Sequence, residues 1–343
     1  MKTAVIAITK HGAALARRLP GDRFISAKFR TEEPANYFEK PIKEVTAEIW
    51  PQYEALVYIV SLGAVVRTIA PFLKDKHVDP AVIVVDDKAN FAISVLSGHV
   101  GGANELTEQI ARELGAQPVV TTASDVGKTI PVDILGRELG WSTEWDHNIT
   151  KISAAVVNEE RIAFVQETGE RNWWKRDTPL PRSISLVSLD DARSFGAVLI
   201  VSDRLLDDGF QSKAVIYRPK SLVLGLGCDR GTSCSEIESF VLSTLAAQRL
   251  SLRSVRNVAT ADLKQDEPGL QEFCAKYGLK MECYSSDVLK EVRAPNPSAT
   301  VEKHVGTPGV SEPAAMLSSG GDLIVPKQKG PKVTVAVARV RFD

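Results

Sequence analysis

One histidine lies in a glycine-rich turn, residues 97–102, between an apolar segment and a helix-forming segment. The imidazole of His99 can exchange a proton near neutral pH. The backbone N–H groups of Gly101 and Gly102, with the helix N-terminus that follows, can hold a carboxylate or a developing oxyanion. The same glycines also suit a plain strand-to-helix turn, where glycine supplies a positive φ. Spacing alone therefore leaves a catalytic and a structural interpretation open.

Polar residues gather around this turn although the preceding segment is too apolar for a surface. They are Ser97, His99, Asn104 and Glu105. Proteins with alternating strands and helices bind their ligands at the carboxyl ends of strands. We therefore expect a pocket at this edge of the predicted sheet.

The elements that position the turn alternate between strand and helix patterns. Strands are expected at 3–8, 23–29, 56–60, 82–85, 91–96 and 118–121, and helices at 11–18, 64–70 and 103–114. The strands at 82–85 and 91–96 are separated by a short polar turn and are expected to pair as a hairpin. This alternation predicts an N-terminal α/β domain over residues 1–127.

The rest of the chain predicts two further α/β regions. The central region, 128–219, is the smaller, with expected helices at 131–139 and 149–157 and strands at 161–165, 183–187, 197–201 and 214–217. The C-terminal region, 220–343, is expected to be a three-layer α/β domain. It opens with a strand at 221–226 and a helix whose start, Ser233 with Glu236, fits a capping box.

Other polar stretches are less specific. Gly225, Gly227 and Gly231 approach the dinucleotide fingerprint, but the third glycine stands one position late. Cys228 beside Arg230 is read as a buried thiol rather than an activated one, because no histidine is near it in sequence.

Two further groups have both a functional and a structural interpretation. Ser61, Gly63 and Arg67 form either a phosphate- or carboxylate-facing helix start or a helix cap. The charged residues Asp262, Lys264 and Glu267 form a solvated loop by default.

Composition narrows the class of protein. A formal charge of −1 over 343 residues gives no general case for a nucleic-acid or membrane-surface partner. The four cysteines show no zinc-binding spacing, and no segment approaches the length of a membrane span. The apolar N-terminus is too short for a signal peptide, so a cytoplasmic protein is expected.

Longer motifs resemble one family, the CbiG proteins of cobalamin biosynthesis. They are the stretches 61–67, 79–82, 85–87, 96–104 and 121–125. The last third resembles the stand-alone CobE protein through the stretches 225–228, 260–267, 309–315 and 326–327. One departure is Asp229, where the family pattern leads us to expect a basic residue after the cysteine. That departure weakens the case for anion binding at this turn.

The resemblance implies an enzyme of the anaerobic route to vitamin B12, a cobalt-precorrin-5A hydrolase. Such enzymes open the δ-lactone of cobalt-precorrin-5A and release acetaldehyde to give cobalt-precorrin-5B. The cobalt belongs to the tetrapyrrole substrate, so no cofactor and no protein metal site are expected. Other enzymes of the pathway are candidate partners. A non-catalytic carrier of corrinoid intermediates is the alternative, and a nucleotide-binding enzyme, suggested only by the imperfect glycine pattern, is a third interpretation.

The resemblance also suggests roles for residues. His99 is expected to act as general base on water or as the acid/base of carbon–carbon cleavage, with Asp87 or Asp125 orienting it or handling a second proton. Arg67 and Lys76 are expected to face substrate carboxylates. The full expected substrate-binding set is Ser61, Gly63, Arg67, Ser97, Gly98, Gly101, Gly102, Asn104, Thr121, Thr122, Gly227, Cys228, Asp262, Lys264, Glu267 and Glu312.

Overall fold

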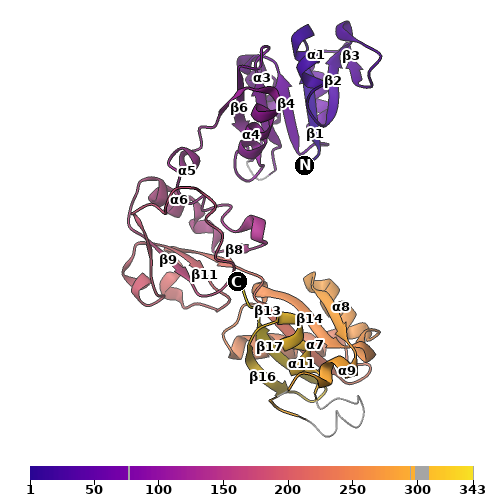
Figure 1. The fold of residues 1–343 in the computed structure, drawn as a ribbon, viewed down its shortest axis with the longest axis vertical. Coiled ribbons are helices and arrows are strands. Elements are labelled where there is room, and N and C mark those ends of the chain that lie inside the picture. Colours follow the sequence, from indigo (N-terminus) through magenta and orange to yellow (C-terminus); the bar gives the residue numbers. More distant parts are fainter. Residues whose placement is uncertain (76–77, 294, 298–308, 343) are drawn as a thin grey trace. The chain divides into compact units, whose positions relative to one another are not determined.

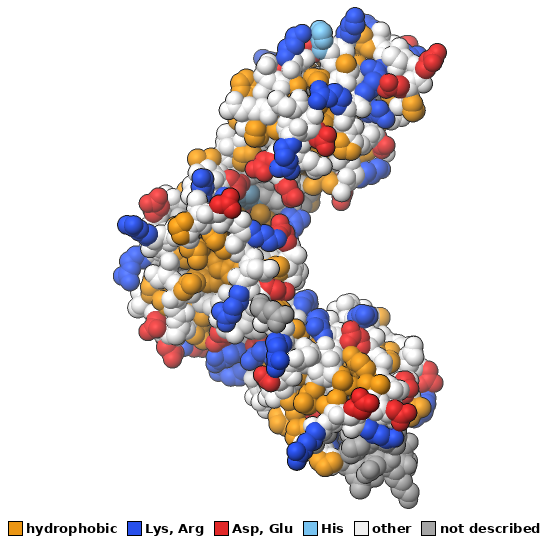
Figure 2. All heavy atoms as spheres, in the orientation of Figure 1, with side chains coloured by type: hydrophobic (Ala, Val, Ile, Leu, Met, Phe, Trp, Pro, Cys, Tyr) orange, Lys and Arg blue, Asp and Glu red, His pale blue; other side chains and the backbone are white. Residues whose placement is uncertain are grey.

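The computed structural model describes residues 1–75, 78–293, 295–297 and 309–342. The chain forms two compact units, Met1–Ile134 and Leu135–Asp343, and holds three sheets (Figure 1). Acidic and basic side chains are interspersed over the face drawn in Figure 2. None of the described helices is both long and apolar enough to cross a membrane.

The first unit is built on a seven-stranded sheet of order β3-β2-β1-β4-β5-β6-β7. Its strands are β1 (Thr3–Ala7), β2 (Asp22–Ser26), β3 (Asn36–Phe38), β4 (Ala55–Ile59), β5 (Ala81–Val85), β6 (Phe91–Leu96) and β7 (Gln117–Val119). Strands β1 to β5 run parallel, whereas β6 pairs with β5 antiparallel and β7 follows the direction of β6. The expected hairpin of β5 and β6 is confirmed.

Helices cover both faces of this sheet and make three layers. The helices are α1 (Lys10–Ala16), α2 (Ile42–Ile49), α3 (Leu62–Ile69), α4 (Ala103–Leu114) and the short α5 (Ala123–Val126). Helices α1 and α4 pack on one face against Val5, Val57 and Ile83. Helices α2 and α3 pack on the other face. Burial on both faces explains why β1, β4 and β5 are continuous apolar runs rather than alternating ones.

The antiparallel hairpin reverses the direction of the chain within the sheet. Leu96, the last residue of β6, pairs with Val82 near the start of β5. The turn after β6 and the segment after β7 therefore lie at the edge where β1, β4 and β5 begin. The loops that follow β4 and β5 lie at the opposite edge.

The second unit contains the other two sheets. The central sheet has the order β10-β9-β11-β12-β8, with only β8 antiparallel to its neighbour. Its elements are β8 (Ser142–Glu144), α6 (Ile149–Val157), β9 (Ile162–Gln166), β10 (Ile184–Leu186), β11 (Ala197–Val201) and β12 (Ala214–Arg218). Apolar residues of β9, β11 and β12 pack around the buried ring of Phe210.

The C-terminal sheet has the order β15-β14-β13-β17-β16, in which β17 runs antiparallel to both of its neighbours, β13 and β16, and the other strands share one direction. Its strands are β13 (Leu222–Cys228), β14 (Val255–Ala261), β15 (Lys280–Tyr284), β16 (Leu323–Lys329) and β17 (Val333–Arg339). Helices α7 (Cys234–Ala247) and α8 (Pro268–Tyr277) cover one face, and α9 (Ser286–Lys290) and α11 (Ser311–Ser319) the other. The expected three-layer arrangement is confirmed.

Several sequence expectations need correction. The helix expected at 131–139 does not form, because Gly136 and Gly140 adopt left-handed backbone angles and only the 3-10 turn Arg137–Leu139 remains. Strands β3, β8 and β15 and helices α2 and α9 were not expected. By contrast, α6 and the expected capping box of α7 are present.

The glycines of the imperfect dinucleotide pattern serve close packing. A Cβ added at Gly225 would lie 1.7 Å from the carbonyl oxygen of Ser311, because α11 crosses β13 directly at that point. At Gly227 it would lie 2.7 Å from the hydroxyl of Thr334. The contact with α11 therefore explains Gly225, the contact with Thr334 of the neighbouring strand β17 accounts for Gly227, and Gly231 has a left-handed φ of 73°.

We predict that Gly225→Ala destabilises the protein by about 1–3 kcal/mol, because the added methyl group overpacks the contact between α11 and β13. Urea unfolding followed by circular dichroism measures the change. Gly196→Ala is the matched control, since an added Cβ meets no atom within 4 Å there. Equal midpoints for the two variants would contradict this account of the contact.

Candidate active site

The turn after β6 is closed by its own backbone. Ser97 has a left-handed φ of 57°, and its carbonyl accepts from the N–H of Ala103 at 3.2 Å. The N–H of Gly102 donates to the carbonyl of His99 at 3.0 Å. A Cβ added at Gly101 would lie 2.4 Å from the Cβ of Ser97, so this position requires glycine. The Gly102 amide, expected to face an oxyanion, is thus already committed to the turn.

Three side chains surround the imidazole that this turn presents. His99 Nε2 lies 3.1 Å from Asp125 Oδ2 and 3.1 Å from Ser124 Oγ. On the other side of the ring, Nδ1 lies 3.1 Å and 3.3 Å from the two oxygens of Asp133. The His99 side chain is 12% exposed, against 30% for Asp125 and 21% for Asp133. Polar side chains therefore contact both nitrogens of the ring.

Asn104, in the first turn of α4, ties this group to the sheet. Its Oδ1 accepts from the hydroxyl of Ser94 on β6 at 2.7 Å, which fixes the orientation of the amide. Its Nδ2 then donates to Thr122 Oγ1 and to Asp125 Oδ2, both at 2.8 Å. The same carboxylate oxygen of Asp125 therefore receives hydrogen bonds from Asn104 and His99.

The two carboxylates raise the pKa of His99 to about 9. Hydrogen bonds to Asp125 and then Asp133 favour the charged ring, and they outweigh the opposing effect of burial. His99 is therefore an imidazolium at neutral pH. In that state it is a proton donor, which favours the acid role over the expected role of general base on water.

The structure separates the expected N-terminal residues into two groups. Thr122 and Asp125 join His99, and Thr121 immediately precedes them in the chain. Asp87 lies beyond the other end of β6, where it accepts a hydrogen bond from Thr9. The six residues of β6 span about 20 Å. Asp87 therefore cannot orient His99, and this part of the expectation was wrong.

Ser61, Gly63 and Arg67 also lie at the edge opposite to His99, because α3 starts after the carboxyl end of β4. The guanidinium of Arg67 donates to the carbonyl of Gly63 at 3.3 Å. The Ser61 side chain makes no capping hydrogen bond. Lys76 lies outside the described residues.

The expected residues of the C-terminal region lie in the second unit, and two carboxylates there are buried. Glu267 is 2% exposed and accepts from the Gly231 N–H at 3.1 Å, with Lys264 Nζ at 3.3 Å. Glu312 is 1% exposed and accepts from the N–H of Lys327 at 2.8 Å. Glu267 is thus part of a buried network and not, as expected by default, of a solvated loop.

The remaining residues of this region form no catalytic arrangement with them. Gly227 and Cys228 end β13, and Cys228 is half-buried rather than fully buried; desolvation raises the pKa of its thiol, which agrees with the expectation that the thiol is not activated. The Asp262 carboxylate accepts from the N–H of Leu263 at 2.7 Å.

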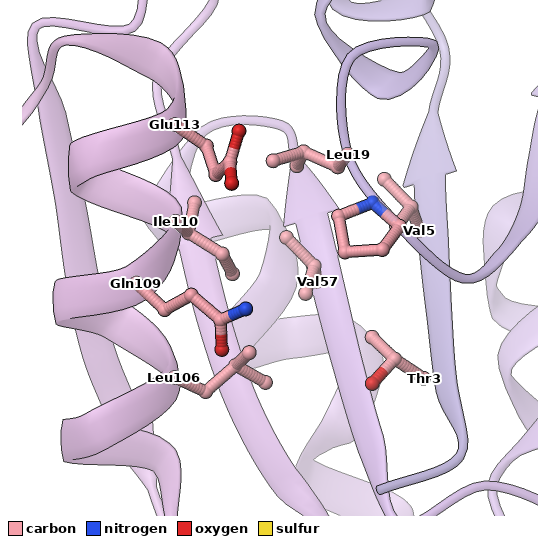
Figure 3. A pocket seen from close by; sticks show the side chains of 9 residues that line it. Thr3, Val5, Leu19, Val57, Leu106, Gln109, Ile110 and Glu113 are labelled. Atoms are coloured by element: carbon pink, nitrogen blue, oxygen red, sulfur yellow. The ribbon is translucent and has the colours of Figure 1, made fainter.

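A hollow in the first unit lies beside α4, away from the expected residues. Figure 3 shows Leu106, Gln109, Ile110 and Glu113 of α4 facing the side chains of β1, β4 and Leu19. The space in it that a water-sized sphere can occupy is about 20 Å³, enough for about one water molecule and far below the volume of a small-molecule site. It is lined mainly by apolar groups and contains no group of the His99 network. No three histidine, cysteine or acidic side chains in the described part of the chain are arranged to hold a metal ion.

An α/β unit that presents an imidazolium between two carboxylates at a sheet edge has the constellation of an acid–base enzyme. Family models identify the family in three consecutive parts: "Cobalamin synthesis G N-terminal" over residues 44–125, "Cobalamin biosynthesis central region" over 130–219, and "Cobalamin synthesis G C-terminus" over 222–338. The chain belongs to this cobalamin synthesis G (CbiG) family.

Relatives of this chain extend over its whole length. The cobalt-precorrin-5A hydrolase of Priestia megaterium is 46% identical, with 99% of this chain and 95% of that protein covered. The cobalt-precorrin-5A hydrolase of Salmonella typhimurium is 31% identical, with 98% and 97% covered. The CobE protein of Sinorhizobium sp. is 32% identical over 34% of this chain and 79% of its own length.

Sequence reasoning assigned no role to Ser124, although it stands in the quoted stretch 121–125, and it missed Asp133 altogether. Asp133 lies outside every motif quoted for the family resemblance and within a stretch expected to be helical. One feature of the sequence could have pointed to Asp133: it follows Asp125 by eight residues, in the segment that continues from the same edge of the sheet.

We predict that His99 makes the folded state less stable as the pH rises. The pKa of His99 is raised from 6.5 to about 9 by folding, so its stabilising effect is complete below pH 6.5 and is lost as the pH passes 9. The loss amounts to about 3 kcal/mol in the free energy of unfolding. Urea titrations between pH 6 and 9.5, on the parent and on His99→Gln, isolate this term as a difference. Parallel pH curves for the two proteins would contradict the assigned charge.

Proposed function

We propose that this protein is a cobalt-precorrin-5A hydrolase that opens the δ-lactone of its substrate and releases acetaldehyde, giving cobalt-precorrin-5B. The proposal is supported by relatives of that name along the whole chain and by the constellation around His99. The single observation that carries the chemistry is the imidazole held between Asp125 and Asp133. We infer that cobalt arrives within the substrate, that the chain needs no cofactor of its own, and that it acts in the cytoplasm.

Lactone opening needs one proton acceptor and one donor. Water adds to the lactone carbonyl and loses a proton, the acyl carbon–oxygen bond breaks, and the departing ring oxygen gains a proton. Asp125 is the more exposed of the two carboxylates beside His99 and is the acceptor in this proposal. His99, as imidazolium, donates from Nε2 to the departing oxygen, so that no alkoxide accumulates.

In acetaldehyde release His99 and Asp125 act again, with the roles of proton donor and proton acceptor exchanged. A hydroxyl gives up its proton as its carbon becomes the aldehyde carbonyl. The carbon–carbon bond to the macrocycle breaks, and the macrocycle carbon keeps the electron pair and takes a proton. After the first step His99 is neutral and accepts at Nε2, whereas Asp125 carries a proton. The two steps therefore return both groups to their initial states.

The test is incubation of purified protein with cobalt-precorrin-5A while acetaldehyde and the mass of the macrocycle are followed together. Conversion to cobalt-precorrin-5B with one acetaldehyde per macrocycle supports the proposal. Tight binding of the macrocycle without either product would instead indicate a carrier of corrinoid intermediates.

We predict that His99→Ala lowers the rate of acetaldehyde release by about 10²–10⁴-fold, the usual contribution of a general acid–base group. His147→Ala is the matched control, because His147 is exposed and contacts only the carbonyl of Gln211 among its described partners. A His99→Ala rate within a few-fold of the control, with the circular dichroism unchanged, would remove His99 from the mechanism.

A further inference from the structure

We propose that Asp133 is the positioning residue of this site: it keeps the proton on Nδ1 of His99 and aims Nε2 at the reacting groups. The expected change in reaction rate rests on the proposed function. The expected change in the protonation of the His99 ring does not.

Donor and acceptor matching carries the argument. A carboxylate only accepts hydrogen bonds, and both oxygens of Asp133 lie within 3.3 Å of Nδ1. Nδ1 must therefore carry a proton in every state in which this contact holds. When His99 gives up its other proton, the neutral ring is fixed as the tautomer whose Nε2 accepts.

The segment that leads to Asp133 is anchored immediately before it. Ile130 and Val132 are each 1% exposed and point into the protein, whereas Asp133 meets the ring. The N–H of Thr129 donates to the carbonyl of Ser124 at 2.9 Å, which ties the segment to α5. Since α5 also carries Asp125, one local structure holds the two carboxylates on opposite sides of the imidazole.

Ser124 gives the site a second possible interpretation. Its hydroxyl, His99 and Asp133 have the order of a serine hydrolase triad, with Ser124 Oγ 3.1 Å from Nε2. However, Asp125 Oδ2 lies at the same distance from Nε2 and, being charged, is the stronger acceptor. Nε2 thus carries a proton and does not take one from Ser124. Asp133 therefore positions an acid rather than activating a nucleophile.

Two carboxylates are the main charged groups that act on the ring. Asp125 approaches from α5 and Asp133 from the segment after it, and both raise the pKa of His99. Removing the charge of Asp133 leaves Asp125 as the main group that favours the imidazolium. The effect of removing this charge can therefore be measured directly as a lower pKa of His99.

The experiment compares Asp133→Asn, Asp133→Glu and the control Glu108→Gln, which removes a carboxylate from the exposed side of α4. Histidine-selective NMR measures the pKa of His99, whose signals are assigned by their loss in His99→Gln.

For Asp133→Asn we expect the His99 pKa to fall by about 1–3 units. We also expect kcat to fall on the order of 100-fold, with KM changed only a few-fold and the alkaline limb of the pH–rate profile moved to lower pH. Asp133→Glu should recover part of both effects, and intact-protein mass during turnover should show no acyl adduct.

Each outcome is decisive for one of the two proposals. An unchanged His99 pKa and rate in Asp133→Asn, or an acyl adduct on Ser124, would overturn the positioning role. If the parent protein releases no acetaldehyde, the proposed function fails, whereas the NMR titration still decides whether Asp133 fixes the ring. Should Asp133→Asn fail to fold, the pKa and rate of Asp133→Glu against Glu108→Gln provide the same comparison.

Discussion

The antiparallel pairing of β6 with β5 determines where the polar groups of the first unit lie. Asp86 closes the turn between them, because its carboxylate accepts from the N–H groups of Lys88 at 2.9 Å and Phe91 at 2.6 Å. This reversal carries the chain back to the edge where the other strands start. Strand β7 then follows β6 in parallel and delivers α5 to the same edge. A parallel β6 would have placed His99 beside Asp87 and Arg67.

Electrostatics couples the stability of this edge to its chemistry. Asp125 and Asp133 face each other across one imidazole, and two carboxylates so close together repel unless a cation lies between them. The protonated His99 supplies that cation, and Asn104 adds a neutral donor to Asp125. The arrangement that stabilises the folded edge is therefore the arrangement that holds a transferable proton. In the proposed first step Asp125 takes up a proton as His99 gives one up, so a single charged carboxylate, that of Asp133, then lies beside the neutral ring.

Much of this architecture could be read from the sequence because it depends on local pattern. Buried strands, the β5–β6 hairpin and the capping box of α7 all have periodic or turn-specific residues. The prediction that Asp87 orients His99 was wrong, and the expected hairpin already contradicted it. The two strands of a hairpin run in opposite directions, so Asp87 before β6 and His99 after it must lie at opposite edges of the sheet. Asp133 was not predicted for another reason. It belongs to a segment without a periodic pattern, which the sequence analysis placed in the central region, after residue 127. In the structure the first compact unit extends to Ile134 and therefore includes Asp133.

Two glutamates in the family motifs of the C-terminal region have structural partners within their own domain. Glu267 and Glu312 stand in motifs shared with CobE-like proteins, yet both are buried and bonded to backbone N–H groups of their own domain. A buried carboxylate that lost these donors would be left without compensation, at a cost of several kcal/mol. Both glutamates also bind side chains, Glu267 that of Lys264 and Glu312 that of Asn296, so their hydrogen bonds stabilise the loops of the domain, whereas those of His99 connect groups that can exchange a proton.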